Sequence, residues 1–330
     1  MEDHSALETL RGLTNWRLTV RREADAVTVL RAVTCDRRAV LPEELFGLPV
    51  TALSDRALAA GAAPVPGEEV LILGGAESED WDNRNITELS LPRTLLHIGD
   101  YAFMNLRSME TLRFYDSLLS TGSASFMNCR SFSHIELTRL SPAQGPALAS
   151  IVRSLQQELD VTIHGADGGV LRLLFPEYIE TYIENKPAHY FQMNIIGRAY
   201  AYHNVFRDKT LSAADYDALW RDFLAAEHDE DSALRLAYLR LRYPLVLSDR
   251  ARGDYAAYLR KRLAGALSHA LRERDAEGLR LLLSLGEADA TALDKALDES
   301  RSLRFTEATA MLLDQRRAGT GKGRARKFAL

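Results

Sequence analysis

The sequence predicts an α+β protein in which a short β-solenoid is followed by an all-α region of helical repeats. A pattern of about 23 residues occupies 86–108 and recurs without a gap at 109–131. From about Val170 onward, apolar residues change from alternate positions to the three-and-four spacing of helices. In the last third of the chain, a second pattern recurs about every 30 residues.

The two copies of the shorter pattern place similar residues at matching positions. The matched pairs are Leu89 and Leu112, Leu91 and Phe114, Leu95 and Leu118, Gly99 and Gly122, Phe103 and Phe126, and Asn105 and Asn128. A third copy begins at Phe132, with Ile135 and Leu137 in the strand positions. Because a single turn cannot bury its own apolar edge, the copies are expected to stack as coils.

Two of the matched positions predict a backbone role. Gly99 and Gly122 are expected in turn conformations that a side chain would strain. Asn105 and Asn128 are expected to satisfy backbone groups of turns, as asparagine commonly does. Each role would then recur once in every coil.

The residues before these copies predict strands and a stretched first copy. The stretch 15–40 alternates apolar and polar residues like half-buried strands, and we expect it to cap the first coil. Residues 39–58 repeat the Leu-Pro element of the later copies at Leu41, with a few residues inserted. A short strand is predicted over 69–73 and a closing strand over 160–164.

An acidic stretch surrounds Trp81 where the period is interrupted. Its acids are Glu77, Glu79, Asp80 and Asp82. The flanking turn-forming residues are typical of a solvated loop. The alternative is a partner contact, because tryptophan is enriched at interface hot spots.

The coil pattern resembles the leucine-rich repeats of the BspA-like class. Leu91-Pro92, Ile98-Gly99, Ala102-Phe103 and the run Phe126 to Cys129 carry this resemblance, which covers about residues 26–165. Thr121 and Ser125 replace the usual isoleucine and alanine, and the fourth unit lacks the Ala-Phe element. The resemblance implies a short leucine-rich-repeat β-solenoid whose last unit serves as a cap.

Stacked coils would align the side chains that alternate with the buried leucines. The candidate protein-binding residues in these outward columns are Glu88, Ser90, Thr111, Arg113, Tyr115, His134, Glu136 and Thr138. Solenoids present extended surfaces of this kind to partners, which is the basis of the protein-binding hypothesis. The alternative is a solvated face with cross-strand pairs such as Arg113 with Glu136.

The segments after the solenoid are predicted to be helical. Over 170–185, Leu174, Tyr178 and Ile179 fall at helical offsets. The stretch 188–206 is rich in aromatic residues, which indicates a helix packed in a core rather than a cofactor pocket. No glycine-rich phosphate loop or metal-ligand cluster accompanies these aromatics.

Helix boundaries and a repeat are also visible further along the chain. Ser212 and Asp215 form a capping box, and a helix over 232–243 is ended by Pro244. The longer pattern matches Leu263 with Leu293, Ala266 with Ala296, Leu267 with Leu297, and Glu277 with Glu307. It resembles a degenerate ankyrin-like α-solenoid, although the Thr-Pro-Leu-His element of that class is absent.

Length and composition indicate a globular protein of two domains, over 1–165 and 166–318, with a flexible basic tail over 319–330. The chain is 46% hydrophobic and 26% charged, and no apolar run is long enough to cross a bilayer. Its polar start lacks a signal peptide, which predicts a cytoplasmic location. Cys35 and Cys129 are expected to be reduced.

The sequence carries no recognisable catalytic, cofactor or metal motif. Its eight histidines lack ligand spacing, and His228 among Glu227, Asp229 and Glu230 fits a solvated loop better than a metal site. The basic tail has two further interpretations. It could dock a partner through 327–330, or contact phosphate weakly through Arg324, Arg326 and Lys327.

These features favour a cytoplasmic, non-catalytic adaptor or scaffold that binds an unknown protein partner through the repeat face, the helical region or both. One alternative is an enzyme with an interdomain pocket near Tyr200, Tyr202 and His203. Another is a nucleic-acid binder, which the net charge of -5 disfavours. Neither a cofactor nor a membrane partner is expected, and the sequence does not specify the oligomeric state.

Overall fold

A computed structural model of the chain describes residues 8–74, 81–142, 145–185, 190–286 and 288–327. Contacts divide the chain into two compact units, each considered separately below. The first comprises Met1–Leu171 and Phe175–Ser212, and the second comprises Arg172–Leu174 and Ala213–Leu330. The predicted fold class is confirmed, because a β-solenoid of about five turns precedes a region of helices.

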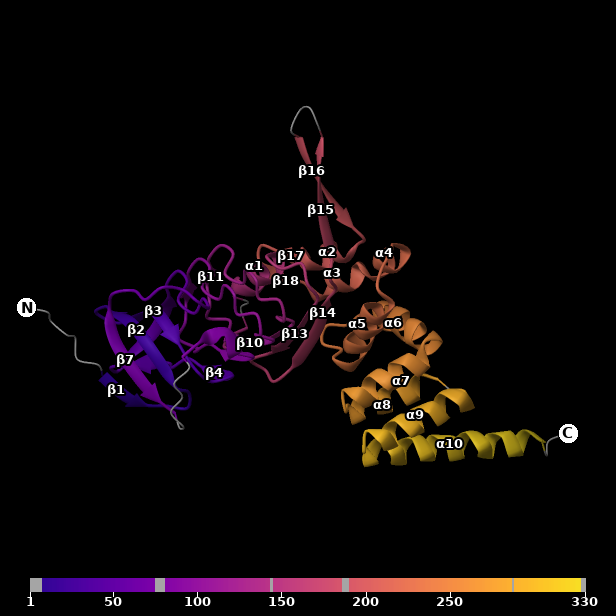
Figure 1. Ribbon diagram of the computed structural model, residues 1–330. Coiled ribbons are helices and arrows are strands. Elements are labelled where there is room, and N and C mark those ends of the chain that lie inside the picture. The colour runs from indigo at the N-terminus through magenta and orange to yellow at the C-terminus, as the bar shows by residue number, and fades with distance from the viewer. Residues whose placement is uncertain (1–7, 75–80, 143–144, 186–189, 287, 328–330) are drawn as a thin grey trace, which may run out of the picture. The chain divides into compact units, whose positions relative to one another are not determined.

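Two sheets form the solenoid (Figure 1). The first contains β1 (Glu8–Arg11), β7 (Glu68–Leu73), β2 (Trp16–Arg22), β3 (Val27–Val33), β6 (Leu48–Leu53), β9 (His97–Ile98) and β11 (Ser120–Thr121) in that order, with β5 (Glu44–Leu45) beside β6. The second contains β14 (Val170–Phe175), β13 (Leu159–His164), β12 (His134–Thr138), β10 (Thr111–Tyr115), β8 (Glu88–Ser90) and β4 (Arg38–Val40) in that order. A 3-10 turn, η1 (Asn83–Asn85), precedes β8.

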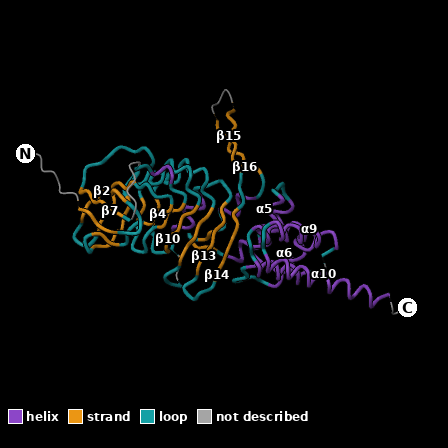
Figure 2. Tube along the Cα trace, turned by 60° about the horizontal axis from the view of Figure 1, so that its bottom comes forward, coloured by secondary structure: helices purple, strands orange, loops and turns teal. Residues whose placement is uncertain are grey.

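Each of the two aligned copies contributes one strand to each sheet, and neighbouring coils pair in parallel. Leu112 lies opposite Leu89 on one side and Ile135 on the other, so the predicted register is confirmed. The stretched first copy joins the same stack, because Ala39 pairs with Leu89 and β6 pairs with β9. Figure 2 shows β4, β10, β13 and β14 following one another across the second sheet.

The apolar columns of the repeat fill the space between the two sheets. Leu89, Leu112 and Ile135 are fully buried. Phe103 and Phe126 pack in successive coils with ring centroids 5.2 Å apart. Burial of each such side chain contributes about 1.5–3 kcal/mol, so stacking is the main source of stability in the solenoid.

The predicted reason for the repeated glycine was wrong. Gly99 and Gly122 do not have left-handed backbone angles, and those angles occur instead at Tyr101 (φ 56°) and Ala124 (φ 48°). A Cβ atom at Gly122 would lie only 2.4 Å from the backbone nitrogen of Asp100 in the preceding coil. Glycine is therefore required by the close approach of neighbouring coils.

The repeated asparagines occupy left-handed turn positions. Asn105 has a φ of 66° and Asn128 a φ of 63°, a conformation that asparagine tolerates better than most residues. The side-chain amide of Asn128 donates to the amide oxygen of Asn105 at 2.9 Å. This hydrogen bond joins the two side chains along the stack, whereas the sequence predicts a bond from the side chain to a turn backbone.

The predicted N-terminal cap covers one edge of the second sheet. Trp16 on β2 is 1% exposed, and its indole N–H donates to the carbonyl oxygen of Val40 at 2.8 Å. The backbone N–H of Val40 donates to the Thr14 hydroxyl at 3.0 Å. Both backbone groups of Val40 on edge strand β4 are therefore satisfied by side chains of the cap.

The helices predicted over 170–185 and 188–206 were wrong for most of these residues. The described strands are β14, β15 (Ile179–Asn185) and β16 (Tyr190–Ile196), and the last two pair antiparallel as a hairpin. Helix is confined here to α2 (Ala199–His203). The segments are rich in β-branched and aromatic residues, which favour strands, and spacing alone does not separate the two structures in short apolar runs.

The remaining elements of the first unit pack at the end of the solenoid. They are α1 (Ala147–Arg153), β17 (Phe206–Arg207) and β18 (Thr210–Leu211). Tyr202 and Phe206 are buried, as predicted for an aromatic core. Tyr190 and Phe191, which belong to the same predicted stripe, have side chains outside the described set.

Apart from Arg172–Leu174, which belong to β14, the regular structure described in the second unit is helical. Its helices are α3 (Ala213–Ala218), α4 (Trp220–Ala225), α5 (Glu230–Arg242), α6 (Asp249–Lys261), α7 (Leu263–Arg272), α8 (Ala276–Leu285), α9 (Ala290–Ser302) and α10 (Thr306–Lys327). Helix α7 packs on α9, and α8 packs on α10. Arg274 and Arg304 both adopt left-handed turns, with φ of 53° and 52°, after α7 and α9. The predicted spacing of the helix pairs is therefore present in the structure.

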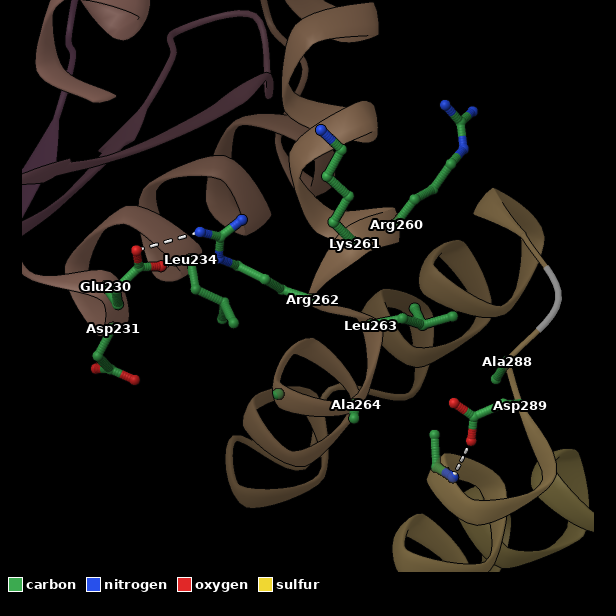
Figure 3. Close-up of a pocket in the computed structure, with 12 residues that line it drawn as sticks. Glu230, Asp231, Leu234, Arg260, Lys261, Arg262, Leu263, Ala264, Ala288 and Asp289 are labelled. Carbon is green, nitrogen blue, oxygen red and sulfur yellow. Dashed lines mark hydrogen bonds and ion pairs between the residues drawn. The ribbon is translucent and has the colours of Figure 1, made fainter. Parts of the chain in front are cut away.

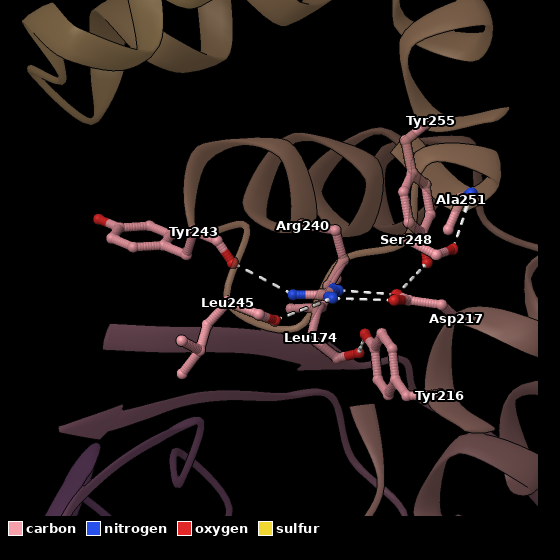
Figure 4. A network of polar contacts seen from close by, with 9 residues as sticks. All are labelled: Leu174, Tyr216, Asp217, Arg240, Tyr243, Leu245, Ser248, Ala251 and Tyr255. Atoms are coloured by element: carbon pink, nitrogen blue, oxygen red, sulfur yellow. Dashed lines mark hydrogen bonds and ion pairs between the residues drawn. The ribbon is translucent and has the colours of Figure 1, made fainter. Parts of the chain in front are cut away.

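A buried polar network fixes the start of this unit (Figure 4). Arg240 is 0% exposed and makes two hydrogen bonds to the Asp217 carboxylate, at 2.7 and 2.8 Å. The hydroxyl of Tyr255 also donates to Asp217, at 2.9 Å, and Arg240 donates to the carbonyl oxygen of Tyr243 at 3.1 Å. The network joins α3, α5 and α6, and its hydrogen bonds offset the cost of burying the ion pair.

Helix α10 extends as far as Lys327, whereas the sequence predicts a flexible tail from residue 319. The backbone of 319–327 is helical, and the flexibility of this segment stays a prediction. Residues 328–330 of the proposed docking peptide lie outside the described residues. No helix in the described part of the chain has the length and apolar character needed to span a membrane.

Candidate functional site

The predicted protein-binding residues lie on the outward face of the second sheet. Buried Leu112 and Phe114 alternate with outward side chains on β10, which fixes this direction. Thr111 lies opposite Glu88 and His134, Arg113 lies opposite Ser90 and Glu136, and Tyr115 lies opposite Thr138. We call these eight residues, together with Arg38, the ladder face. The predicted alignment of these side chains in columns is confirmed. Their role in binding a partner stays a prediction.

A row of alternating charges crosses four strands of the ladder face. Arg113 uses Nε and Nη2 to donate to both carboxylate oxygens of Glu136, at 2.9 and 3.2 Å. Its Nη1 donates to Glu88 at 2.7 Å. The other oxygen of Glu88 lies 2.9 Å from Nε of Arg38 on edge strand β4. The predicted pair between Arg113 and Glu136 is therefore confirmed, within a longer row.

This row orients Arg113 more than it stabilises the fold. The hydrogen bond from Arg113 holds the pKa of Glu88 below its ordinary value, and pairing with Glu136 raises the pKa of Arg113. The Arg113 side chain is 37% exposed and that of Glu136 is 39% exposed, so solvent screens the pair. Pairs of this kind contribute about 1 kcal/mol or less, but two carboxylates hold the guanidinium in one orientation.

Hydroxyl and imidazole groups lie beside the charged row. Tyr115 and Thr138 form the next rung, and β13 extends the face with Thr162 beside Glu136 and His164 beside Thr138. Hydroxyl and imidazole groups can both donate and accept hydrogen bonds. The face is therefore suited to a polar partner surface.

Arg38 belongs to this face but was not among the residues predicted from the sequence. The signal was present in the stretched first copy, because aligning Leu41 with Leu91 places Arg38 opposite Glu88. The inserted residues in that copy hid the correspondence. Arg38 has an 81% exposed side chain, which makes it the most accessible member of the charged row.

The histidine of the predicted enzyme pocket is not available to a substrate. His203 is 0% exposed, and Tyr202 is equally buried. The two ring nitrogens of His203 lie 3.1 and 2.9 Å from the carbonyl oxygens of Val152 and Pro176. The expectation of a pocket-lining histidine was therefore wrong, because this ring is enclosed by backbone of its own unit.

The residues around His228 have structural partners. Asp229 caps α5 by accepting from the Ser232 N–H at 2.7 Å. Nδ1 of His228 lies 2.8 Å from the carbonyl oxygen of Ala226. Among the residues that the structure describes, no group of three or more histidine, cysteine or acidic side chains is placed to hold a metal.

Trp81 is half-buried rather than fully exposed. The guanidinium of Arg17 lies 5.1 Å from the centroid of its ring. Glu77, Glu79 and Asp80 of the predicted acidic loop lie outside the described residues. A partner contact at Trp81 stays a prediction.

The helical unit contains a separate hollow (Figure 3), a cavity of about 550 Å³ between the start of α5, the junction of α6 with α7 and the start of α9. Nε of Arg262 donates a hydrogen bond to the Glu230 carboxylate at 2.8 Å, and the two opposite charges form an ion pair. Asp289 accepts from the N–H of Ala292 at 2.7 Å and so caps α9. These side chains connect or cap helices, and the residues that line the cavity do not indicate a particular ligand.

The parallel coils, the buried leucine columns and the Asn105–Asn128 pair define a β-solenoid built from sequence repeats. Residues 77–144 match the family model described as BspA type leucine rich repeat region (6 copies). The predicted resemblance is thus supported for this part of the chain. No curated protein matches the chain.

Three solved structures are similar to part of the chain. The T. pallidum leucine-rich repeat protein is 18% identical with a TM-score of 0.27, over 36% of this chain and 50% of that one. A leucine-rich cell surface protein from Faecalibacterium prausnitzii A2-165 is 18% identical with a TM-score of 0.25, over 37% of this chain and 27% of that one. A leucine-rich repeat protein from Bacteroides capillosus ATCC 29799 is 16% identical with a TM-score of 0.30, over 45% and 94% respectively. The chain thus spans half the length, or less, of the first two proteins.

Proposed function

We propose that this chain is a non-catalytic adaptor or scaffold whose ladder face binds a protein partner. The observation that carries the proposal is the fixed position of Arg113, which two carboxylates hold two residues before Tyr115 on the same strand. Arginine and tyrosine are enriched among residues that dominate binding energy. A side chain already held in one orientation loses less conformational entropy on binding, which favours affinity.

The contacts of Arg113 also suggest the chemistry of the partner. A guanidinium has five N–H groups, and three of its nitrogen atoms already donate to Glu88 or Glu136. The remaining N–H groups can donate to carbonyl or carboxylate oxygens of a partner. Tyr115 adds a flat apolar ring with a hydroxyl at its end, so the pair supports a polar interface around one aromatic anchor.

The helical unit is proposed to be a second binding surface. Its stacked pairs α7–α8 and α9–α10 support an ankyrin-like arrangement, because both pairs use a left-handed turn at Arg274 or Arg304. We also propose that the protein works in the cytoplasm. Neither Cys35 nor Cys129 is joined in a disulfide, which is compatible with a reducing compartment.

The proposal is tested by isolating a partner with the full chain as bait and then measuring its affinity for variants. Arg113→Ala and Tyr115→Ala should each weaken binding by about tenfold or more, which corresponds to the loss of a hot-spot residue. Arg93→Ala is the matched control, because it removes an exposed ion pair with Glu43 elsewhere in the same unit. Wild-type affinity for both face variants would contradict the proposal.

A further inference from the structure

The β15–β16 hairpin extends away from the strands of the solenoid, as Figures 1 and 2 show. Its seven residue pairs run from Ile179 opposite Ile196 to Asn185 opposite Tyr190. In the described part of the chain, the two strands pair with each other and with no other strand. Each of them therefore presents one backbone edge to which no described strand is bonded.

The described side chains of the hairpin place apolar surface in solvent. Ile179 is 53% exposed, and Ile196, directly opposite, is 46% exposed. Tyr182, on the other face of the hairpin, is 64% exposed. A hairpin of two strands is marginally stable alone, and sheets gain stability when further strands are added. The hairpin therefore has the open edges and the exposed apolar side chains of an incomplete sheet.

The two edges of the hairpin differ in charge. β15 carries Glu180 and Glu184, and charged residues on an edge strand discourage pairing with another strand. β16 has the sequence YFQMNII, which contains no charged residue, proline or glycine. Its aromatic and β-branched residues favour strands, and uncharged segments of this length and composition readily pair with another strand. The edge suited to pairing is therefore that of β16.

The sequence of β16 is also complementary to itself in the antiparallel direction. When two copies of β16 run antiparallel with Met193 opposite Met193, aromatic residues lie opposite isoleucines, and the two amide residues lie opposite each other. The pairs are Tyr190 with Ile196, Phe191 with Ile195, and Gln192 with Asn194. Aromatic and β-branched residues stabilise a sheet when they are cross-strand neighbours, and amides can hydrogen-bond to each other.

The same operation on β15 is unfavourable. In the register that pairs all seven residues of two β15 strands, Glu180 would lie opposite Glu184 of the other copy, and this would occur twice. Like charges in directly opposite positions destabilise a strand pair. Charge therefore selects the β16 edge, and self-complementarity selects a second copy of this chain as its occupant.

We propose that the chain forms a dimer in which β16 pairs antiparallel with β16 of a second copy, about a two-fold axis at Met193. The product is a four-stranded sheet with the acidic β15 strands on the outside. Because both copies use the same edge, the pairing is complete with two molecules. Seven residue pairs form a small interface, so we expect a weak dimer with a Kd on the order of 10 µM. The ladder face lies on other strands, and the dimer does not depend on partner binding there.

The first test is sedimentation velocity of the full chain over about 1 to 500 µM, a range that spans the expected Kd. We expect a concentration-dependent change from monomer to dimer. Met193→Lys places two like charges in neighbouring strands, about 5 Å apart, and should raise the Kd about tenfold or more.

The matched control is Tyr182→Lys, at the residue opposite Met193 in the hairpin. Its two new charges would lie three strand spacings apart, about 14 Å. This distance exceeds the Debye length of about 8 Å at physiological ionic strength, so the Kd should change little.

Three results would overturn the proposal. The first is a chain that stays monomeric over the whole range, whether or not a strand of another protein binds to it. The second is a dimer that neither lysine variant weakens, and the third is a dimer that both weaken equally, because its interface would then lie elsewhere. Arg113→Ala should dimerise like the wild type, so failure of ladder-face binding and failure of dimerisation are distinguishable.

The second test is cross-linking of Met193→Cys, which decides the question even if the lysine variant does not fold. Combination with Cys35→Ser leaves buried Cys129 as the remaining native thiol. A thiol cross-linker long enough for neighbouring strands, but shorter than three strand spacings, should join two copies. Tyr182→Cys in the same background should stay unlinked. Equal cross-linking of both variants, or of neither, would contradict a two-fold axis at Met193.

Discussion

Arg240 and Asp217 form a two-bond ion pair in the interior of the helical unit, with N–O distances of 2.7 and 2.8 Å. Replacement of one partner leaves the other charge buried, so Arg240→Leu should destabilise this unit by about 3–5 kcal/mol. Urea unfolding followed by circular dichroism measures the loss. Arg221→Ala is the matched control, because its pair with Asp254 has a 60% exposed arginine side chain. That variant should leave the stability nearly unchanged, because solvent screens an exposed pair, and an equal loss in both variants would contradict the interpretation.

The repeated glycine makes a second prediction. Gly122→Ala places a methyl group 2.4 Å from the backbone of the preceding coil, and backbone cannot move away cheaply. We expect destabilisation of about 1–3 kcal/mol or more, from thermal or urea unfolding. Gly253→Ala in α6 meets nothing within 4 Å and should be stabilising by about 0.5–1 kcal/mol. The free energy of unfolding should therefore fall in Gly122→Ala and rise in Gly253→Ala.

A third prediction concerns the pH dependence of the charged row. The pKa of Glu88 is lowered by its hydrogen bond from Arg113, so the contribution of this pair is present above the ordinary glutamate pKa. It is lost as pH falls through the lowered value. In Arg113→Ala, the Glu88 pKa should rise, because its largest lowering influence is removed, as followed by carboxyl NMR titration. Arg93→Ala should leave the Glu88 pKa where it is, and an unchanged pKa in Arg113→Ala would contradict the assignment.

The two cysteines should differ in reactivity. Cys129 is 3% exposed, and burial raises its pKa to about 12, so its thiolate is scarce and enclosed near pH 8. Cys35 is only half-buried. A colorimetric thiol assay on the native chain should therefore detect Cys35 first, and Cys129 only after denaturation. In Cys35→Ser, rapid native labelling should disappear, and its persistence would show that Cys129 is accessible.

The solenoid could be predicted from the sequence because its signal is repeated. Leu89 and Leu112 occupy the same position in two successive copies, and stacking forces matched residues to become neighbours. The outward columns followed from the same alternation, which is why the position of Arg113 beside Glu136 could be deduced. Periodicity thus specified both the core and the location of the ladder face.

The hairpin could not be deduced in the same way, because it occurs once. Ile179 and Tyr178 satisfied a helical spacing by coincidence in a short apolar run, whereas Ile179 actually pairs with Ile196. The role of Gly122 could not be predicted either. A glycine in the sequence indicates that a side chain does not fit, but it does not show whether a turn or a neighbouring coil is the cause. The burial of His203 depends on contacts between distant segments and leaves no local pattern.

Val40 illustrates a further consequence of the cap formed by Trp16 and Thr14. An uncovered outer strand presents free N–H and C=O groups, on which a second molecule can add a strand and then a third. Such head-to-tail growth does not close and ends in filaments. Because the backbone N–H and C=O of Val40 are already hydrogen-bonded to the cap, β4 offers a poor template for the addition of a strand at this residue.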